Sequence, residues 1–456
     1  MNEDLNVGAA ETPARTVLRH SLMTFGTRVG TVLVNIPTSI LVARLLGTEG
    51  QGSYASAVIF PTTFAFIGLL GVDAAHTYFL SRKRYSLGQI NSQSAVLTLV
   101  LSAILVPAYL VFVRLYDGVG TEAFRTILVS AAALVPILIA KYLSIALLLG
   151  LQRIRWFNAA NLLQAAALLV FMLVNLLVLK GGVQGAIFAY MASEATVTLL
   201  AFRVARREAG GRPLFERPTK ELLKRSFVYG LQGHIGNVLI QFTYRFDMFL
   251  VLSFAGLPAQ GLYSIAVILA EKLSHIPQSV QVVLFPKLSS LEVDDANRLT
   301  PRVLRSSLAL TALAAIVLYL LSRPLLTLFY GAEYAGSLAP FRVLVPGIVA
   351  LTAARILSSD LSGRDRRIYH TIATAAAFGL NVVLCLVWIP RHGIVGAAWA
   401  STVSYTVQSV VMLVFFRRLS GVPIREALVP KREDVRLISG FLRSLVQRRR
   451  GRTPGR

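Results

Sequence analysis

Long blocks of apolar residues recur along the whole chain of 456 residues, and short charged segments separate them. A helix needs about 20 apolar residues to cross the hydrocarbon core of a bilayer. Hydrophobic residues make up 55% of the sequence and charged residues only 15%, whereas soluble domains carry roughly 25% charged residues. The pattern excludes a string of soluble domains and predicts an all-α polytopic membrane protein.

The apolar blocks predict twelve transmembrane helices in two pseudo-symmetric six-helix bundles. The first six are expected near 21–46, 53–80, 92–115, 124–149, 157–179 and 183–202. The second six are expected near 226–254, 261–285, 306–329, 337–358, 369–389 and 393–416. The predicted parts of the chain are a tail (1–20), the first bundle (21–202), a basic linker (203–225), the second bundle (226–416) and a basic tail (417–456).

Lysine and arginine concentrate in alternate connections between the predicted spans. The formal net charge is +24, which in a soluble chain would suggest a nucleic-acid partner. In a membrane protein, cytoplasmic loops collect these residues. Here they gather in the tails and the even-numbered connections, and the odd-numbered connections hold little beyond Arg44, Lys180 and Arg391. We therefore expect both termini in the cytoplasm and no nucleic-acid partner.

The two halves of the sequence repeat each other. Stretches that begin at Gln51 and Gly182 return 209 and 211 positions later, and one that begins at Gly150 returns after 213 positions. Three matches in order and at nearly constant spacing favour an internal repeat over chance likeness between small-residue loops. Each half has an even number of spans, so both halves should insert in the same orientation around a pseudo-two-fold axis along the membrane normal. Two such bundles would enclose a central cavity.

Polar residues form a stripe on the first predicted helix of each half. The stripe residues are Thr24, Arg28 and Asn35 in the first half and Asn237, Gln241 and Arg245 in the second. They follow helical spacing, and lipid cannot satisfy their hydrogen bonds. The wall of a hydrophilic cavity is the favoured interpretation, and hydrogen bonding between helices is the alternative.

Two further cations, Lys141 and Arg355, lie eight or nine residues before the repeated glycine motif of their halves. Cations that reach a central cavity from both halves suit an anionic headgroup, above all phosphate or pyrophosphate. The alternative is that each cation neutralises a buried acid such as Glu194 or Asp247. Both interpretations stay open at this point.

Four acids within the predicted spans are candidates for coupling transport to protons or sodium. They are Asp73, Glu194, Asp247 and Glu271. Charged groups at such depth are expensive unless they are paired or face water, so each acid is also a candidate member of a structural ion pair. The sequence has no P-loop, no CxxC, HExxH or GxSxG motif, and no metal-ligand spacing among its six histidines. We therefore expect gradient-driven transport, without a cofactor, a metal or enzymatic activity.

The C-terminal tail predicts an amphipathic basic helix over residues 435–446. Its arginines and its apolar stripe are typical of a helix that lies on the anionic inner leaflet. Recruitment of a partner protein is the alternative.

Several segments resemble bacterial polysaccharide flippases. Residues 42–54, which read VARLLGTEGQGSY, are similar to the segment that joins the first two spans of that family. The family's corresponding segment in the second half resembles residues 245–247 followed by 261–263, and its later signatures resemble residues 285–289, 331–334 and 389–398. The likeness covers nearly all of residues 18–416.

This resemblance implies the oligosaccharide flippase branch of the multidrug/oligosaccharidyl-lipid/polysaccharide exporter superfamily. Such proteins move undecaprenyl-pyrophosphate-linked glycans from the cytoplasmic to the outer leaflet of the bacterial inner membrane, for O-antigen, capsule or exopolysaccharide assembly. The implied partners are a lipid-linked oligosaccharide, membrane lipids and the polysaccharide polymerase or other assembly proteins. Basic cavity residues would hold the pyrophosphate, and the natural positions are Arg28, Lys141, Arg245 and Arg355.

Three alternatives accompany this interpretation. A cation-coupled multidrug exporter of the same superfamily would rely on the acids rather than on the cations. A polysaccharide polymerase or ligase would need a large outer loop, and the predicted outer connections are short. A non-transporting scaffold would act through the basic tail. Lipid II is the less suitable flippase substrate, because lipid II flippases usually have two further C-terminal helices.

Overall fold

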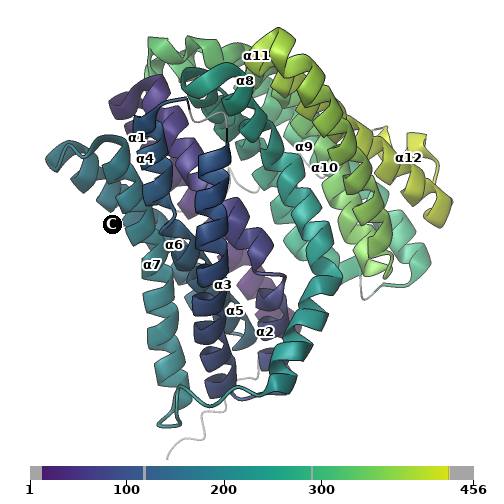
Figure 1. Cartoon of the computed structure of the whole chain (residues 1–456). Helices are drawn as coiled ribbons and strands as arrows, with labels where there is room; N and C mark the ends of the chain where they lie inside the picture. The colour runs from purple at the N-terminus through teal and green to yellow at the C-terminus, as the bar shows by residue number, and fades with distance from the viewer. Residues whose placement is uncertain (1–12, 117–119, 289–290, 430, 432–456) are drawn as a thin grey trace, which may run out of the picture. The chain divides into compact units, whose positions relative to one another are not determined.

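The computed structural model describes residues 13–116, 120–288, 291–429 and 431 (Figure 1). Across those residues every regular element is a helix, and the described part contains no strand. The predicted spans are mostly helical, although turns at residues 69–71 and 132–133 interrupt the spans predicted near 53–80 and 124–149. The all-α prediction is therefore confirmed for the described residues, and the predicted helix over 435–446 lies outside them.

The helices follow one another with short connections. The first half holds α1 (Pro13–Gly68), α2 (Val72–Ser81), α3 (Leu87–Leu115), α4 (Glu122–Ala131), α5 (Leu134–Gly150), α6 (Ile154–Leu173), the π-helix η2 (Val174–Val178) and α7 (Gly182–Ala209). The second half holds α8 (Lys220–Leu288), α9 (Val293–Leu325), the π-helix η3 (Leu326–Tyr330), the 3-10 helix η4 (Ala332–Ser337), α10 (Leu338–Gly363), α11 (Arg367–Ser420) and α12 (Ile424–Leu428).

Nine helical segments in the described part are long and apolar enough to cross a bilayer, which makes the chain a multi-pass membrane protein. Three of them have 46, 62 and 54 residues, and at 1.5 Å per residue even the shortest measures about 69 Å, twice the bilayer core of about 30 Å. Each of the three contains one glycine with a non-helical backbone, namely Gly47, Gly256 or Gly393. We expect two crossings in each long segment, and the count of twelve spans stays a prediction.

The backbone repeats where the sequence repeats. Three pairs of left-handed residues lie 209, 211 and 213 positions apart, and these are Gly47 and Gly256, Gly182 and Gly393, and Gln152 and Asp365. Their φ angles are 67° and 77°, 55° and 56°, and 56° and 58°. These three coincidences fall at the spacings of the predicted internal repeat and agree with it.

The described residues pack into two compact units. The first takes the residues up to Val42, Phe60–Arg114 and Val129–His234, and the second takes Ala43–Ile59, the described residues of Leu115–Leu128 and those from Ile235 onward. The two units are not separated by one boundary in the sequence, because residues 43–59 belong to the second unit and residues 203–234 to the first. The predicted bounds of the two bundles and the linker stay a prediction.

Small and aliphatic residues form the interior of the first unit. Helix α5 packs against α2 and α7, and α6 packs against α7. Leu148, Ala160, Val197 and Ala201 meet where α5, α6 and α7 come together. Alanine at such contacts lets membrane helices approach closely, which gives dispersion contacts where lipid provides no hydrophobic driving force.

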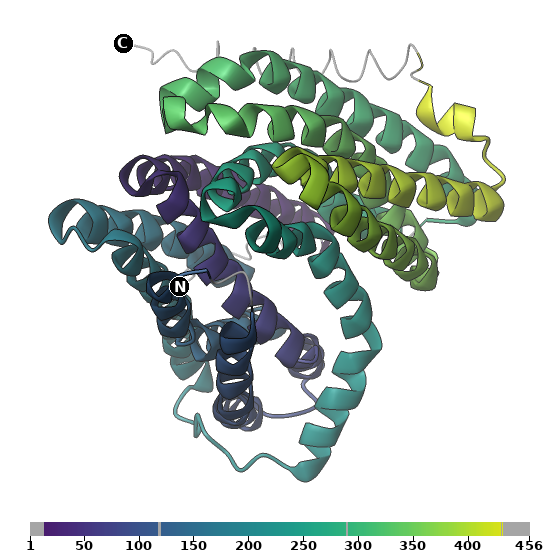
Figure 2. The same cartoon turned by 45° about the horizontal axis from the view of Figure 1, so that its top comes forward.

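In the second unit, α10 packs against α9 and α11, and α10 and α11 lie side by side in green to yellow in Figure 1. Their shared core includes the fully buried Phe341 and Cys385. The short α12, in yellow in Figure 2, lies against α9. Asp360 accepts hydrogen bonds from Thr300 (2.7 Å) and Arg364 (2.7 Å), which ties the adjoining ends of α9 and α10 together.

Candidate functional site

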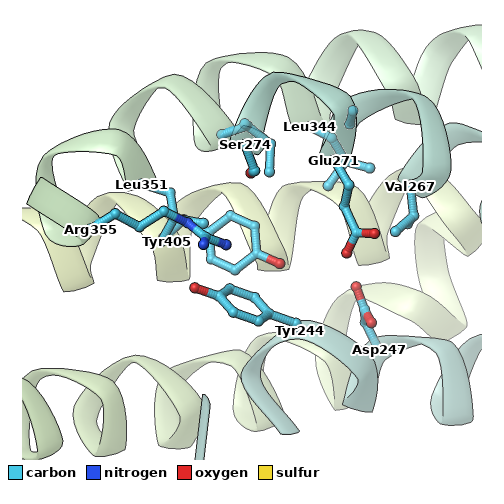
Figure 3. Close-up of a pocket in the computed structure, with 11 residues that line it drawn as sticks. Tyr244, Asp247, Val267, Glu271, Ser274, Leu344, Leu351, Arg355 and Tyr405 are labelled. Atoms are coloured by element: carbon cyan, nitrogen blue, oxygen red, sulfur yellow. The ribbon is translucent and has the colours of Figure 1, made fainter. Parts of the chain in front are cut away.

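A pocket in the second unit gathers charged and aromatic side chains from α8, α10 and α11 (Figure 3). Its empty space is about 350 Å³, including the part open to solvent. The lining residues are Tyr244, Asp247, Val267, Ala270, Glu271, Ser274, Leu344, Ile348, Leu351, Arg355 and Tyr405.

The local sequence explains why these side chains meet. On the second part of α8, the lining residues recur every three or four positions and so share one helix face. The first part of α8 contributes Tyr244 and Asp247, and the break at Gly256 lies between the two parts. Leu344, Ile348 and Leu351 of α10 complete the wall.

Arg245 and Glu271 form a bidentate ion pair across the two parts of α8. The Nη1–Oε1 distance is 3.0 Å and the Nη2–Oε2 distance is 3.3 Å, and the side chains are 29% and 36% exposed. The sequence suggested a headgroup role for Arg245 and a coupling role for Glu271. The structure brings the two together, so each charge already has a partner.

Asp247 is held by three donors in the interior of the second unit. Its carboxylate accepts hydrogen bonds from the Tyr263 hydroxyl (2.5 Å), the Ser401 hydroxyl (2.9 Å) and the backbone N–H of Met248 (2.8 Å). Figure 3 shows the carboxylates of Asp247 and Glu271 pointing toward one another in the pocket. The three hydrogen bonds hold the Asp247 carboxylate in one orientation.

Arg355 is the pocket cation without an acid partner. Its guanidinium carbon lies 5.3 Å from the centre of the Tyr244 ring, and it forms no ion pair within the described residues. Its Nε atom is buried and has no hydrogen-bond acceptor in that part of the structure. A buried donor left unpaired costs about 1–3 kcal/mol, so an anion that reached this group would relieve that cost.

In the first unit, Lys141 pairs with Glu194. The Nζ–Oε2 distance is 2.8 Å, and the side chains are 22% and 2% exposed. For Lys141 the structure therefore favours neutralisation of a buried acid, which was the alternative to an anion site. Arg355 differs from its repeat counterpart in this respect.

The other residues of the first unit have separate surroundings. Thr24 accepts a hydrogen bond from Asn158 of α6 at 3.0 Å, which is the interhelical alternative for this stripe position. Arg28 is half-buried on α1. Asp73 lies in the first turn of α2, where the helix dipole stabilises negative charge, and it forms no ion pair with any described residue.

Three stripe residues keep unused hydrogen-bonding groups. The side chains of Asn35 in the first unit and of Asn237 and Gln241 in the second make no hydrogen bond within the described part of the chain, and they are half-buried or exposed. In a bilayer such amides must face water, protein or a ligand. This observation fits the wall of a hydrophilic cavity.

Sequence reasoning missed the two pocket tyrosines. Tyr244 and Tyr405 lie with ring centres 5.7 Å apart in an edge-to-face contact. Tyr244 could have been found, because it lies one position before Arg245 and three before Asp247. Tyr405 gave no such signal, since a single tyrosine in an apolar helix looks like any other core aromatic.

Comparison with known families matches residues 17–292 to the model of the polysaccharide biosynthesis protein family. An uncharacterised membrane protein of Methanocaldococcus jannaschii is 23% identical over 209 residues, which are 44% of this chain. The match spans 41% of the length of that relative.

Solved structures share the fold over nearly the whole chain. A lipid II flippase, MurJ, in an inward closed conformation has a TM-score of 0.75 at 15% identity, and the match covers 90% of this chain and 89% of the other. An inward-facing multidrug resistance transporter of the MATE family and MOP superfamily has a TM-score of 0.70 at 16% identity, with 86% and 94% covered. At such identities the likeness concerns the fold alone.

Proposed function

Because this chain belongs to the polysaccharide biosynthesis protein family, we propose that it is a flippase for lipid-linked oligosaccharides. It carries an undecaprenyl-pyrophosphate-linked glycan from the cytoplasmic to the outer leaflet of a bacterial inner membrane by alternating access. Both termini lie in the cytoplasm in this proposal. The fold shared with MOP-superfamily structures supports it.

The observation that carries the proposal is the state of Arg355. Its guanidinium lines a pocket, has a buried Nε without an acceptor, and has no acid partner among the described residues. A planar guanidinium binds phosphate oxygens with two parallel hydrogen bonds. A pyrophosphate therefore suits this group better than a neutral or cationic ligand does.

The other three cations differ in how they contribute to headgroup binding. Arg28, half-buried on α1 of the first unit, stays a candidate for binding the anionic headgroup. Arg245 contributes when the pyrophosphate competes with Glu271, because both side chains of that pair are about one-third exposed. Lys141 keeps its bond to the nearly buried Glu194 and acts through the packing of the first unit.

The experiment measures glycan exposure in liposomes that contain the purified protein. An impermeant glycan-cleaving enzyme reports how fast an undecaprenyl-pyrophosphate oligosaccharide reaches the outer leaflet. Hydrogen bonds to a charged group contribute about 1.5–3 kcal/mol, so Arg355→Ala should slow flipping by roughly 10- to 100-fold. Arg355→Lys should retain part of the rate. Arg391→Ala, which removes an exposed cation outside the pocket, is the matched control.

Two results would contradict the proposal. An Arg355→Ala protein that flips as fast as the parent would remove the headgroup role of this residue. No flipping of any tested prenyl-pyrophosphate glycan, with and without a proton gradient, would remove the flippase function.

A cation-coupled multidrug exporter is the second candidate, and the facing carboxylates of Asp247 and Glu271 favour it. Acids at a membrane pocket are suited to a proton, sodium or a cationic drug. In this case Asp73, Glu194, Asp247 and Glu271 would be tested as coupling groups. Overexpression would then raise resistance to cationic drugs, and Glu271→Gln would abolish that resistance.

A further inference from the structure

The turn that follows α2 carries three successive cations, Arg82, Lys83 and Arg84, which together are called the basic turn below. All three side chains are exposed, and none forms an ion pair with a described residue. Exposed cations are usual on the cytoplasmic side of a membrane protein. Residues 291–293, which lie 209 positions later, nevertheless read LEV, so the counterpart of this turn in the predicted repeat does without cations.

The end of α2 fixes the backbone of the basic turn. The Lys83 N–H donates a hydrogen bond to the carbonyl oxygen of Leu80 at 3.0 Å, and the Arg84 N–H donates one to that of Phe79 at 3.0 Å. These two bonds are the pattern of a Schellman motif. Lys83 takes its left-handed position, with a φ of 52°, a conformation that is uncommon outside glycine. The chain therefore keeps a cation at a position where the backbone favours glycine.

Tyr78 of α2 and Tyr229 of α8 form a tyrosine stack beside the basic turn. Their ring centres lie 4.7 Å apart, and the ring planes differ by 13°. The guanidinium carbons of Arg84 and Arg82 lie 5.3 and 6.0 Å from the centre of the Tyr78 ring, within the range of a cation–π contact. A guanidinium that packs on a ring by its face keeps the N–H donors at its edge free for phosphate oxygens. The stack therefore orders both arginines before a ligand binds, which lowers the entropy lost on binding.

The tyrosine stack rests on a packed part of the first unit. The start of α8, in teal in Figure 1, runs close to α2, and a Cβ atom on Gly230 would collide with the backbone of Gly71. Beside the stack, Phe79 and Leu222 belong to one buried apolar cluster. The two tyrosines therefore stand on a close helix contact with a core of its own.

Apolar side chains lie next to the stack on α8. Val228 and Leu231 are 55% and 43% exposed, and Tyr229 itself is 37% exposed. In a membrane protein, exposed aliphatic groups beside arginines are typical of the depth at which acyl chains meet headgroups. A free phosphate would use the cations alone, whereas a lipid would use both the cations and these apolar groups.

We propose that the basic turn and the tyrosine stack form a binding site for an anionic phospholipid. The arginines bind its phosphate, and its acyl chains lie on Val228 and Leu231. A zwitterionic lipid suits the site less well, because its own ammonium group meets three cations that have no acid partner among the described residues. All these residues belong to the first unit, so the site is separate from the pocket in the second unit. It does not depend on what the protein transports, and its place in the inner leaflet rests on the predicted cytoplasmic position of the basic turn.

Binding of a fluorescent phosphatidylglycerol to the purified protein in detergent tests the site without any glycan. Arg82→Gln with Arg84→Gln should raise the Kd roughly tenfold or more. Tyr78→Leu keeps every charge and should raise the Kd about threefold, because the ring that orders the arginines is lost. Tyr78→Phe keeps the ring and should bind like the parent. The matched control is Arg203→Gln with Arg206→Gln, since both arginines are exposed on α7 and contact no ring among the described residues; it should leave the Kd nearly unchanged.

Competition against the same probe identifies the occupant. Unlabelled phosphatidylglycerol should displace the probe, whereas phosphatidylcholine and millimolar inorganic phosphate should not. An equal loss of binding in the control variant would reduce the site to general surface charge and overturn the proposal. Displacement by undecaprenyl pyrophosphate but not by unlabelled phosphatidylglycerol would overturn it as well, because the site would then belong to the transported substrate.

The arginine variants keep the test valid if Tyr78→Leu loses stability, because the replaced side chains are exposed. Phosphatidylglycerol binding that Arg82→Gln with Arg84→Gln leaves unchanged would remove the site. Selective binding by a protein that flips no glycan would leave the site standing and remove the proposed function alone.

Discussion

Removing the amino group of Lys141 should destabilise the first unit, because it leaves the carboxylate of Glu194 as an uncompensated charge. The two groups are 2.8 Å apart, and the Glu194 side chain is only 2% exposed. Breaking a buried ion pair by removing one partner costs about 3–5 kcal/mol. The Lys141 side chain is 22% exposed, so the lower end, about 3 kcal/mol, applies. At about 2–4 °C per kcal/mol, the apparent Tm should fall by roughly 6–12 °C.

A double-mutant cycle in detergent separates this ion pair from other effects. The variants are Lys141→Met, Glu194→Gln and the two together, and removing both charges should recover about 2 kcal/mol relative to the sum of the single changes. The buried thiol of Cys385 reports unfolding through a thiol-reactive dye. Arg125→Met, which breaks an exposed pair with Glu122, is the control and should leave the Tm unchanged.

The functional readout of the same variants sharpens the test. The double variant should flip glycan at close to the parental rate, because Lys141 acts through packing. Arg355→Ala, by contrast, should flip slowly and keep the parental Tm. The reasoning is refuted if the double variant is as unstable as the two single changes added together. It is equally refuted if Lys141→Met keeps the parental Tm.

Three further predictions concern stability and the pocket. Asp360→Ala should lower stability by about 3–5 kcal/mol, measured by the same dye, since it leaves the mostly buried Arg364 without its acid; an unchanged Tm would contradict this. Gly256→Ala should lower stability by about 1–2 kcal/mol through its φ of 77° alone. Gly379→Ala, at a helical glycine with open space around it, should leave stability unchanged. Equal losses of stability in the two variants would contradict the argument from the backbone angle. Tyr263→Phe removes a 2.5 Å hydrogen bond to Asp247 and should cost about 1–3 kcal/mol; an unchanged Tm would contradict this.

The course of the helices could be predicted from the sequence because it depends on local chemistry. Runs of apolar residues set the positions of the spans, and the glycines at 47, 256 and 393 allowed the left-handed turns that interrupt three long segments. The repeat could also be read directly, since similar sequence at a spacing of 209 positions accompanies similar φ angles, 67° at Gly47 and 77° at Gly256.

The pairing of charges could not be predicted in the same way. Lys141 and Glu194 meet because α5 packs against α7. Arg245 meets Glu271 because the two parts of α8, which Gly256 separates, face each other. Both contacts depend on tertiary packing that no local pattern encodes. The depth of a cation in a span therefore indicated that it needed a partner, but it did not distinguish an acid of the chain from an anionic ligand.

Residues 43–59, which pack in the second unit, cross α8 at Gly52 and Gly261, and this contact obeys the rule of an interface between two identical subunits. Position 52 meets the carbonyl group of 257 and position 261 meets that of 48, so that each partner makes the contact that its counterpart makes in return. Such reciprocity is what a half-length ancestor would have needed to associate with a second copy of itself. One glycine would then have served both sides of the dimer, and fusion of the two genes would have freed the sites to diverge. Both positions are glycine in this chain, and a methyl group on either backbone would push the other away.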